Sequence, residues 1–127
     1  MMTGTVTARS EAVVPLQVRA AGGRAELVQA VVDTGFTDFL ALSHRRIAEL
    51  ALSFRASLLL TLADGSAARF STYRAVVEWH GHPRPVTVVG IQAGALLGMG
   101  LLHGSRLTMD VLDDGLVRIE PIAGPRP

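Results

Sequence analysis

Short apolar segments separated by glycine-containing turns follow one another along almost the whole chain. The strongest turn signals are Gly22-Gly23, Ala63-Asp64-Gly65-Ser66, His80-Gly81-His82-Pro83 and Asp113-Asp114-Gly115. The segments between them are rich in Val, Ile and Leu, which fit the half-buried surface of a sheet, and Asp-Gly is among the preferred two-residue hairpin turns. The pattern therefore predicts a mainly β domain of the barrel or sandwich type, in which strands form antiparallel hairpins.

The apolar residues within these segments predict where the strands and helices lie. We expect strands at residues 3–16, 25–32, 39–42, 58–62, 69–79, 86–91, 107–112 and 116–122. Ser43 is a suitable N-cap for a helix of about two turns, whose apolar residues recur at i, i+3 and i+4 from Ile47 onward. Residues 96–103 are compatible with a second short helix. The expected fold class is mainly β with one or two short helices.

The length of 127 residues is that of one compact domain. A hydrophobic content of 49% is sufficient to build a buried core. We expect residues 1–123 to form this domain and residues 124–127, with the sequence Gly-Pro-Arg-Pro, to form a tail that cannot continue a strand.

Charge and cysteine content argue against several classes of function. The 12 basic residues are all arginines, they are dispersed along the chain, and the net charge is only +1, so we expect no nucleic-acid partner. Cysteine is absent, which excludes disulfides and thiolate chemistry. No apolar stretch approaches the ~20 residues of a membrane span, and the N-terminus does not resemble a signal peptide. These features predict a cytoplasmic protein without a membrane partner.

One acidic residue stands where an apolar strand is expected to end. Residues 31–37 have the sequence Val-Val-Asp-Thr-Gly-Phe-Thr, with Asp33 followed by Thr34 and Gly35. A reactive carboxylate is well presented from a rigid strand end, where Gly lets backbone approach closely and a Thr hydroxyl can hold the loop through hydrogen bonds. The alternative interpretation is an ordinary turn, because Asp, Thr and Gly are all common in turns.

Three separated segments together resemble the retropepsin-like, or retroviral-type, aspartic peptidases, a family that includes single-domain bacterial members. Asp33-Thr34-Gly35 is similar to the catalytic triplet of that family. Ala95-Leu96-Leu97-Gly98, followed by Met99-Gly100-Leu101-Leu102, resembles its second signature, a loop beside the triplet. The hairpin through Ala63-Asp64-Gly65-Ser66 stands between the two, where the family carries its flap. The resemblance implies a closed, barrel-like acid-protease fold with one lobe per chain.

The resemblance also implies a homodimeric endopeptidase without metal or cofactor. Its mechanism needs two carboxylates, and the chain has one suitable triplet; the rival Asp113-Asp114-Gly115 lacks the Thr or Ser and fits a solvated turn better. Two chains would therefore pair Asp33 with Asp33, and the segment 116–122 stands where the family interleaves its chain ends. The second-signature residues would be Leu96, Leu97 and Gly98. A peptide or protein substrate would contact Phe36, Thr37, Asp38, Leu62, Ala63, Asp64, Gly65 and Ser66.

Other interpretations stay open from the sequence. The same fold could serve as a dimeric peptide-binding or regulatory module with little or no activity, or as a subunit of a larger assembly. The apolar residues Phe36, Leu62 and Ala63 favour hydrophobic side chains on both sides of a cleaved bond. His80 and His82 have a spacing that a metal could share, but no acidic or Cys partner is near them in the sequence, so we interpret them as turn residues.

Overall fold

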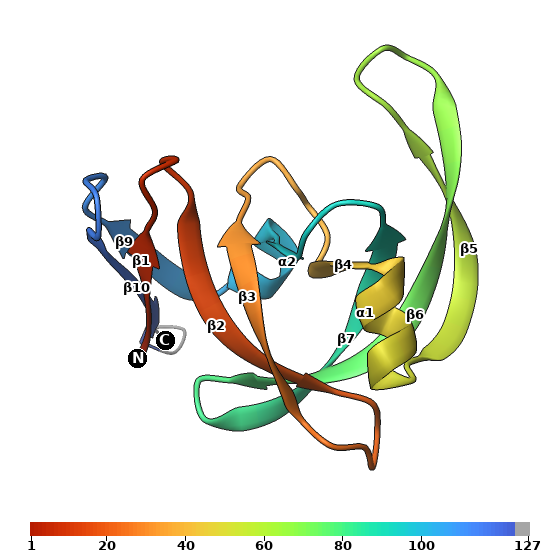
Figure 1. Ribbon diagram of the computed structural model, residues 1–127, viewed down its shortest axis with the longest axis horizontal. Helices are drawn as coiled ribbons and strands as arrows, with labels where there is room; N and C mark the ends of the chain where they lie inside the picture. The colour runs from red at the N-terminus through yellow and green to blue at the C-terminus, as the bar shows by residue number, and fades with distance from the viewer. Residues whose placement is uncertain (124–127) are drawn as a thin grey trace.

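Ten strands and two short helices make up residues 1–123, the part of the chain that the computed structural model describes (Figure 1). In chain order they are β1 (Met2–Val6), β2 (Ala12–Arg19), β3 (Glu26–Val32), β4 (Leu40–Ser43), α1 (His44–Leu50), β5 (Ser53–Thr61), β6 (Ala67–Trp79), β7 (His82–Ile91), β8 (Leu96–Leu97), α2 (Met99–Leu102), β9 (Ser105–Met109) and β10 (Leu116–Pro121). The predicted mainly β class with two short helices is confirmed. The predicted tail, 124–127, lies outside the described residues.

The strands close into a barrel because β2 pairs with β6 at its far end. Strands β6, β7, β4, β8, β3 and β2 lie side by side in that order, and antiparallel bridges from Val18 to Val77 and from Arg19 to Val76 join the last strand to the first. On the open side of β2, strands β1, β10 and β9 continue the sheet, while β5 lies on the outer edge of β6. The closed barrel expected from the sequence is confirmed.

Alternation along the strands builds the core inside this barrel. In β2 the side chains of Ala12, Val14, Leu16 and Val18 are buried, whereas the residues between them are exposed or half-buried. Such alternation places one side of a strand in the interior. Each fully buried Val or Leu side chain contributes roughly 1.5–3 kcal/mol through the hydrophobic effect. The largest buried residues come from strands all around the barrel and from α2, namely Leu16, Leu40, Leu42, Leu97, Leu101 and Ile119.

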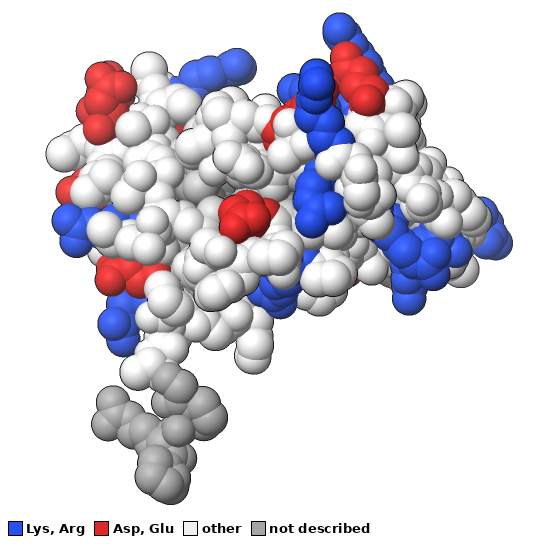
Figure 2. Space-filling view, turned by 90° about the horizontal axis from the view of Figure 1, so that it is seen from below, with Lys and Arg blue, Asp and Glu red and all other residues white. Residues whose placement is uncertain are grey.

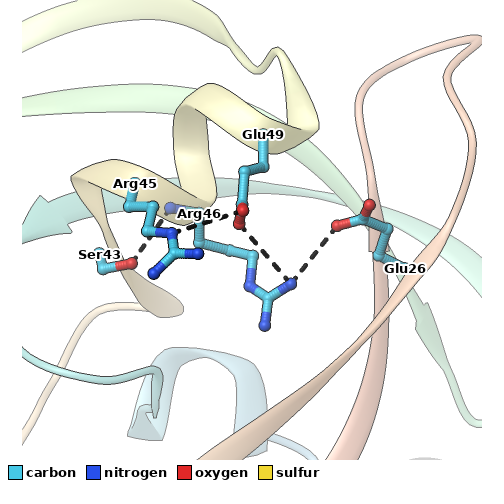
Figure 3. Close-up of polar contacts among 5 residues, drawn as sticks. All are labelled: Glu26, Ser43, Arg45, Arg46 and Glu49. Carbon is cyan, nitrogen blue, oxygen red and sulfur yellow. Dashed lines mark hydrogen bonds and ion pairs between the residues drawn. The ribbon is translucent and has the colours of Figure 1, made fainter.

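Helix α1 begins as its N-cap residue predicts and packs against β4 and β7. The Ser43 hydroxyl accepts a hydrogen bond from the Arg46 backbone N–H at 3.1 Å. The Arg46 guanidinium lies 3.5 Å from a carboxylate oxygen of Glu26 on β3 and 3.9 Å from one of Glu49 (Figure 3). Arg45 lies 3.5 Å from Glu49. Arg46 and Glu26 are half-buried, and Arg45 and Glu49 are exposed. Because all four side chains remain accessible to solvent, each pair contributes at most about 1 kcal/mol, and the buried Ile47 and Leu50 hold the helix.

The expected strand 3–16 is in fact two strands joined by a tight turn, so that prediction was wrong. Residues 7–11 leave the sheet, and the Thr7 N–H donates to the Glu11 carbonyl oxygen at 2.8 Å. Ser10 has a φ of +60°, a conformation that turns usually assign to Gly or Asn. Because the turn contains neither Gly nor Pro, its sequence resembles continued strand.

Two other boundaries differ from the sequence expectation. The β5–β6 hairpin closes through a loop wider than a two-residue Asp-Gly turn, since the last bridged pair is Thr61 with Ala67. Inside that pair, the Leu62 N–H donates to the Ser66 carbonyl oxygen at 2.7 Å, and Gly65 has a φ of +87°. Strand β9 ends at Met109, so Val111 and Leu112, expected in a strand, lie exposed in the connection to β10. Asp113-Asp114-Gly115 forms the expected turn, and both aspartates are exposed.

No helix among residues 1–123 is both long enough and apolar enough to cross a membrane.

Candidate active site

The triplet begins where β3 leaves the barrel, and its first residue is tied to the second-signature loop. Strand β3 runs parallel to the two-residue strand β8, with Val31 opposite Leu96 and Val32 opposite Leu97. The Asp33 N–H then donates to the Leu97 carbonyl oxygen at 2.9 Å. Segments 64 positions apart in the sequence, counted from 33 to 97, are therefore joined by backbone hydrogen bonds directly at the candidate carboxylate.

The turn itself holds the Asp33 side chain. One carboxylate oxygen, Oδ1, accepts a hydrogen bond from the Gly35 N–H at 3.0 Å, and the Phe36 N–H donates to the Asp33 carbonyl oxygen at 3.1 Å. Asp33 is half-buried, and Thr34 and Gly35 are exposed. The carboxylate is thus oriented by backbone while one of its faces stays accessible.

The Thr34 hydroxyl was expected to lock this loop, and it does not do so within the chain. Among residues 1–123 it makes no hydrogen bond, and the residue is exposed. Two backbone donors hold the loop instead. The Gly35 N–H donates to the Asp33 carboxylate, and the Asp33 N–H donates to the Leu97 carbonyl oxygen.

Gly98 lets the loop that follows the triplet lie directly on the second-signature loop. A Cβ at Gly98 would collide with the Asp38 carbonyl oxygen and would come within 2.6 Å of Cδ2 of Phe36. The Gly98 N–H donates to the Phe39 carbonyl oxygen at 3.0 Å, and the Met99 N–H donates to that of Phe36 at 2.8 Å. The predicted second-signature residues Leu96, Leu97 and Gly98 therefore meet the triplet and residues 36–38, as the sequence suggested.

The predicted flap residues stand apart from this cluster. Residues 62–66 form the tip of the β5–β6 hairpin, which projects well beyond the barrel in Figure 1, and all five are exposed. At the tip, the Asp64 carboxylate accepts hydrogen bonds from the Ser66 hydroxyl at 2.6 Å and from the Ser66 N–H at 2.9 Å. These bonds hold the pKa of Asp64 below its ordinary value. Asp64 thus shapes the turn, as its sequence context predicts.

A pair of cavities lies between the site loop and the base of this hairpin. The first, of about 320 Å³, is lined by Asp38, Arg55, Ala56, Ser57, Leu58, Thr72 and Thr87. The second, also of about 320 Å³, shares Arg55 and Thr87 and adds Phe39, Arg74, Ala75, Pro85 and Val86. Asp38 is the one predicted substrate contact among these lining residues. Neither arginine was predicted as a site residue, because a single sequence does not show which strands border the candidate site.

His80 lies in the β6–β7 turn, as interpreted from the sequence, and His82 is the first residue of β7. This turn lies at the opposite end of the barrel from the loop that follows β3 (Figure 1). His80 and Gly81 both have positive φ, 52° and 81°, and form a two-residue hairpin turn between Trp79 and His82. The Nε2 atom of His80 lies 2.8 Å from the Ser105 hydroxyl, and burial lowers the pKa of His80. In the described part of the chain, no group of three or more His, Cys, Asp or Glu residues could hold a metal ion.

Comparison with known proteins bears on the fold of the chain. No protein-family model matches the chain, and neither does any curated protein. Among solved structures, the crystal structure of a retropepsin-like aspartic protease from Rickettsia conorii superposes with a TM-score of 0.57, over 96% of this chain and 91% of that one. The chain has the retropepsin-like fold. The two sequences are 16% identical, so the likeness establishes the fold, and residue roles must be argued from the site itself.

Proposed function

We propose that this chain is one half of a homodimeric aspartic endopeptidase. The observation that carries the proposal is the position of Asp33. It leaves a barrel strand of the retropepsin-like fold, its N–H is bonded to the Leu97 carbonyl, and its carboxylate is oriented by the Gly35 N–H. A rigid strand end and a second supporting loop are what a catalytic group needs for reproducible placement.

The chemistry requires a second carboxylate, which an identical chain would supply. Two aspartates placed against each other cannot both ionise, so they share one proton, the arrangement known from aspartic proteases. The ionised Asp33 takes a proton from water, whose oxygen attacks the carbonyl carbon, while the protonated Asp33 of the other chain polarises the carbonyl oxygen. The Asp33 that received the water proton then donates a proton to the nitrogen, the C–N bond breaks, and the tetrahedral intermediate collapses to a carboxylic acid and an amine.

The terminal strands suggest how the two copies meet. Strand β10 was expected to interleave with a partner chain. Within its own chain, however, both of its edges are hydrogen-bonded: one edge pairs with β1, where Met2 is opposite Ile119, and the other pairs with β9, where Met109 is opposite Val117. Interleaving would require these pairings to open. We therefore place the proposed interface at the site loops and hairpin tips, where polar groups such as the Thr34 hydroxyl have no partner within residues 1–123.

Turnover of a peptide mixture by Asp33→Asn tests the proposal. The substitution keeps the size of the side chain and an oxygen for the Gly35 N–H, but it removes the ionisable group. The matched control is Asp113→Asn, because Asp113 is an exposed aspartate in the β9–β10 connection. We expect Asp33→Asn to lower the rate by roughly 10²–10⁴-fold, the usual contribution of a general acid or base, and the control to match the wild type.

Two results would contradict the proposal. Equal turnover by wild type and Asp33→Asn would remove Asp33 from the chemistry. Absence of turnover by the wild type at every pH from acidic to neutral, with the protein folded and dimeric, would favour the peptide-binding module instead.

A further inference from the structure

The second of the two cavities beside the site loop carries concentrated positive charge. Arg55 and Arg74 both line it, with Phe39, and no acidic side chain is among its lining residues. Figure 2 shows basic side chains without acidic ones at the lower right of the molecule, the side on which Figure 1 places β5 and β6. Within residues 1–123 neither Arg55 nor Arg74 takes part in an ion pair or a side-chain hydrogen bond. Both guanidinium groups are therefore available to an anion.

Strand pairing places Arg55 and Arg74 on the same face of the hairpin, because Ser53 pairs with Arg74 and Arg55 lies two residues after Ser53. A β-bulge occurs at Arg55 itself. Phe54 pairs with Tyr73 and Ala56 pairs with Thr72, so Arg55 is an extra residue with no partner on β6. Bulges bend a strand and redirect side chains. Thr72, which is 2% exposed, donates its hydroxyl to the Ala56 carbonyl oxygen at 2.8 Å and ties the bulge to β6. The backbone position of Arg55 is thus fixed by strand pairing.

Phe39, another residue that lines the cavity, is also held in place. Phe39 lies next to the buried Leu40 at the start of β4. The guanidinium carbon of Arg84 lies 5.7 Å from the centroid of the Phe39 ring, and Arg84 donates to the Leu101 carbonyl oxygen at 3.2 Å. Arg84 therefore contacts Phe39 and Leu101, while Arg55 and Arg74 line the cavity.

The first cavity shares Arg55 and Thr87 with this charged cavity and reaches Asp38 of the site loop. It lies between Asp38, five positions after Asp33, and residues 56–58 of the hairpin. An extended peptide that runs from the triplet beneath the hairpin would meet Asp38 first and the two arginines next. Asp38 and Arg55 both line the first cavity, so their charges offset each other there. The second cavity has two guanidinium groups and no carboxylate, and paired guanidinium groups bind a carboxylate through charge-assisted, often bidentate hydrogen bonds.

We propose that the Arg55–Arg74 cavity is a specificity subsite that binds an aspartate or glutamate side chain of the substrate, a few residues from the cleaved bond. The inference rests on the proposed peptidase function and names the substrate class. Hydrophobic side chains next to the cleaved bond, expected from the sequence, remain compatible with it, because no residue of the triplet lines the charged cavity.

Paired peptides that differ only by Glu or Gln measure the subsite. The pair is moved one position at a time away from the cleaved bond, and kcat/KM is determined for each member. We expect one position at which Glu exceeds Gln by about tenfold, the scale of one hydrogen bond to a charged group. The double variant Arg55→Gln/Arg74→Gln should reduce that ratio to about one, and added salt should reduce it in the wild type.

The matched control replaces two exposed arginines elsewhere in the sheet. Arg106→Gln/Arg118→Gln on β9 and β10 removes the same net charge and should leave the Glu preference intact. A preference that falls equally in both double variants would overturn the subsite, because it would then reflect the overall charge of the protein.

A peptide-binding measurement distinguishes failure of the subsite from failure of the proposed function. Fluorescence anisotropy of labelled Glu and Gln peptides is measured with Asp33→Asn, which binds without turnover. Turnover by the wild type without a Glu preference would overturn the subsite alone. If the wild type cleaves no peptide, the peptidase proposal fails, and the subsite is judged by binding alone. Equal affinities for the Glu and Gln peptides would overturn the subsite. Tighter binding of the Glu peptide that disappears in the Arg55→Gln/Arg74→Gln variant would support the subsite as a recognition site.

Discussion

Replacement of Gly98 by alanine tests whether contact between the two loops holds the candidate site together. The added Cβ would collide with the Asp38 carbonyl oxygen and would lie 2.6 Å from Cδ2 of Phe36 and 2.8 Å from the Phe36 carbonyl oxygen. Two of these three obstacles are backbone atoms, which cannot move aside as a side chain could. The loop that follows the triplet must therefore shift away from β8 and α2.

The size of the effect follows from this geometry. Inserting a methyl group into a tightly packed site costs about 1–3 kcal/mol, and we expect the upper value, because the hydrogen bonds from Gly98 to Phe39 and from Met99 to Phe36 are strained at the same time. The unfolding entropy scales with chain length, and for 127 residues it is about 0.27 kcal/mol/K. The melting temperature should fall by about 10 °C.

The matched control is Gly94→Ala in the loop before β8. A Cβ at Gly94 would have no atom within 4 Å, so this variant should melt within a degree or two of the wild type. Thermal unfolding followed by circular dichroism measures both variants. Well below its melting temperature, Gly98→Ala should also lose about 100-fold in peptide turnover, since a displacement near 1 Å is sufficient for that loss. Equal melting temperatures for the two variants would refute the proposed contact between the loops.

Three further predictions concern the assembly, the pH dependence and the C-terminal strand. After verified subunit exchange, an equal mixture of wild type and Asp33→Asn should retain roughly one quarter of the activity if the site is shared, and about one half if each chain acts alone. Burial lowers the pKa of His80, so the unfolded chain binds a proton at this residue more readily than the folded chain does. The free energy of unfolding should therefore decrease as the pH falls below about 6.5. In denaturant titrations at several pH values, His80→Gln should weaken this dependence, and the control His82→Gln, at an exposed position, should not. Removal of residues 116–127 should abolish the cooperative melting transition, because the fully buried Ile119 belongs to the core of its own chain; a truncated chain that still melts cooperatively would return β10 to the role of an interface strand.

The sequence predicted those parts of the structure that local pattern and chemistry determine. Alternating apolar residues marked the buried side of residues 12–16, and Ser43 marked the start of α1. The triplet and its second signature marked two loops that the structure joins through the Asp33–Leu97 hydrogen bond. A Gly at position 98 is also explained, because the approach of the Asp38 carbonyl leaves no room for a side chain.

Features that depend on distant pairing were not accessible from the sequence. The turn at residues 7–11 places Ser10 at positive φ because β1 pairs with both β2 and β10 and thereby fixes the position of both strand ends. The bulge at Arg55 arises from its register with β6. Each depends on which strands meet, and neither leaves a local signal such as Gly or Pro.

One chain supplies the geometry of the proposed site but not its enclosure. Asp33 is half-buried, Thr34 and Gly35 are exposed, and the hairpin tip stands away from the triplet. Charge stabilisation in a transition state becomes large only where water is excluded and the dipoles are already in place. The proposed mechanism must therefore obtain its dry environment from the second chain, the two hairpins and the bound peptide together. On that reasoning, the peptide is part of the enclosure of the site, and an acidic side chain held by Arg55 and Arg74 would fix its register before the carboxylates act.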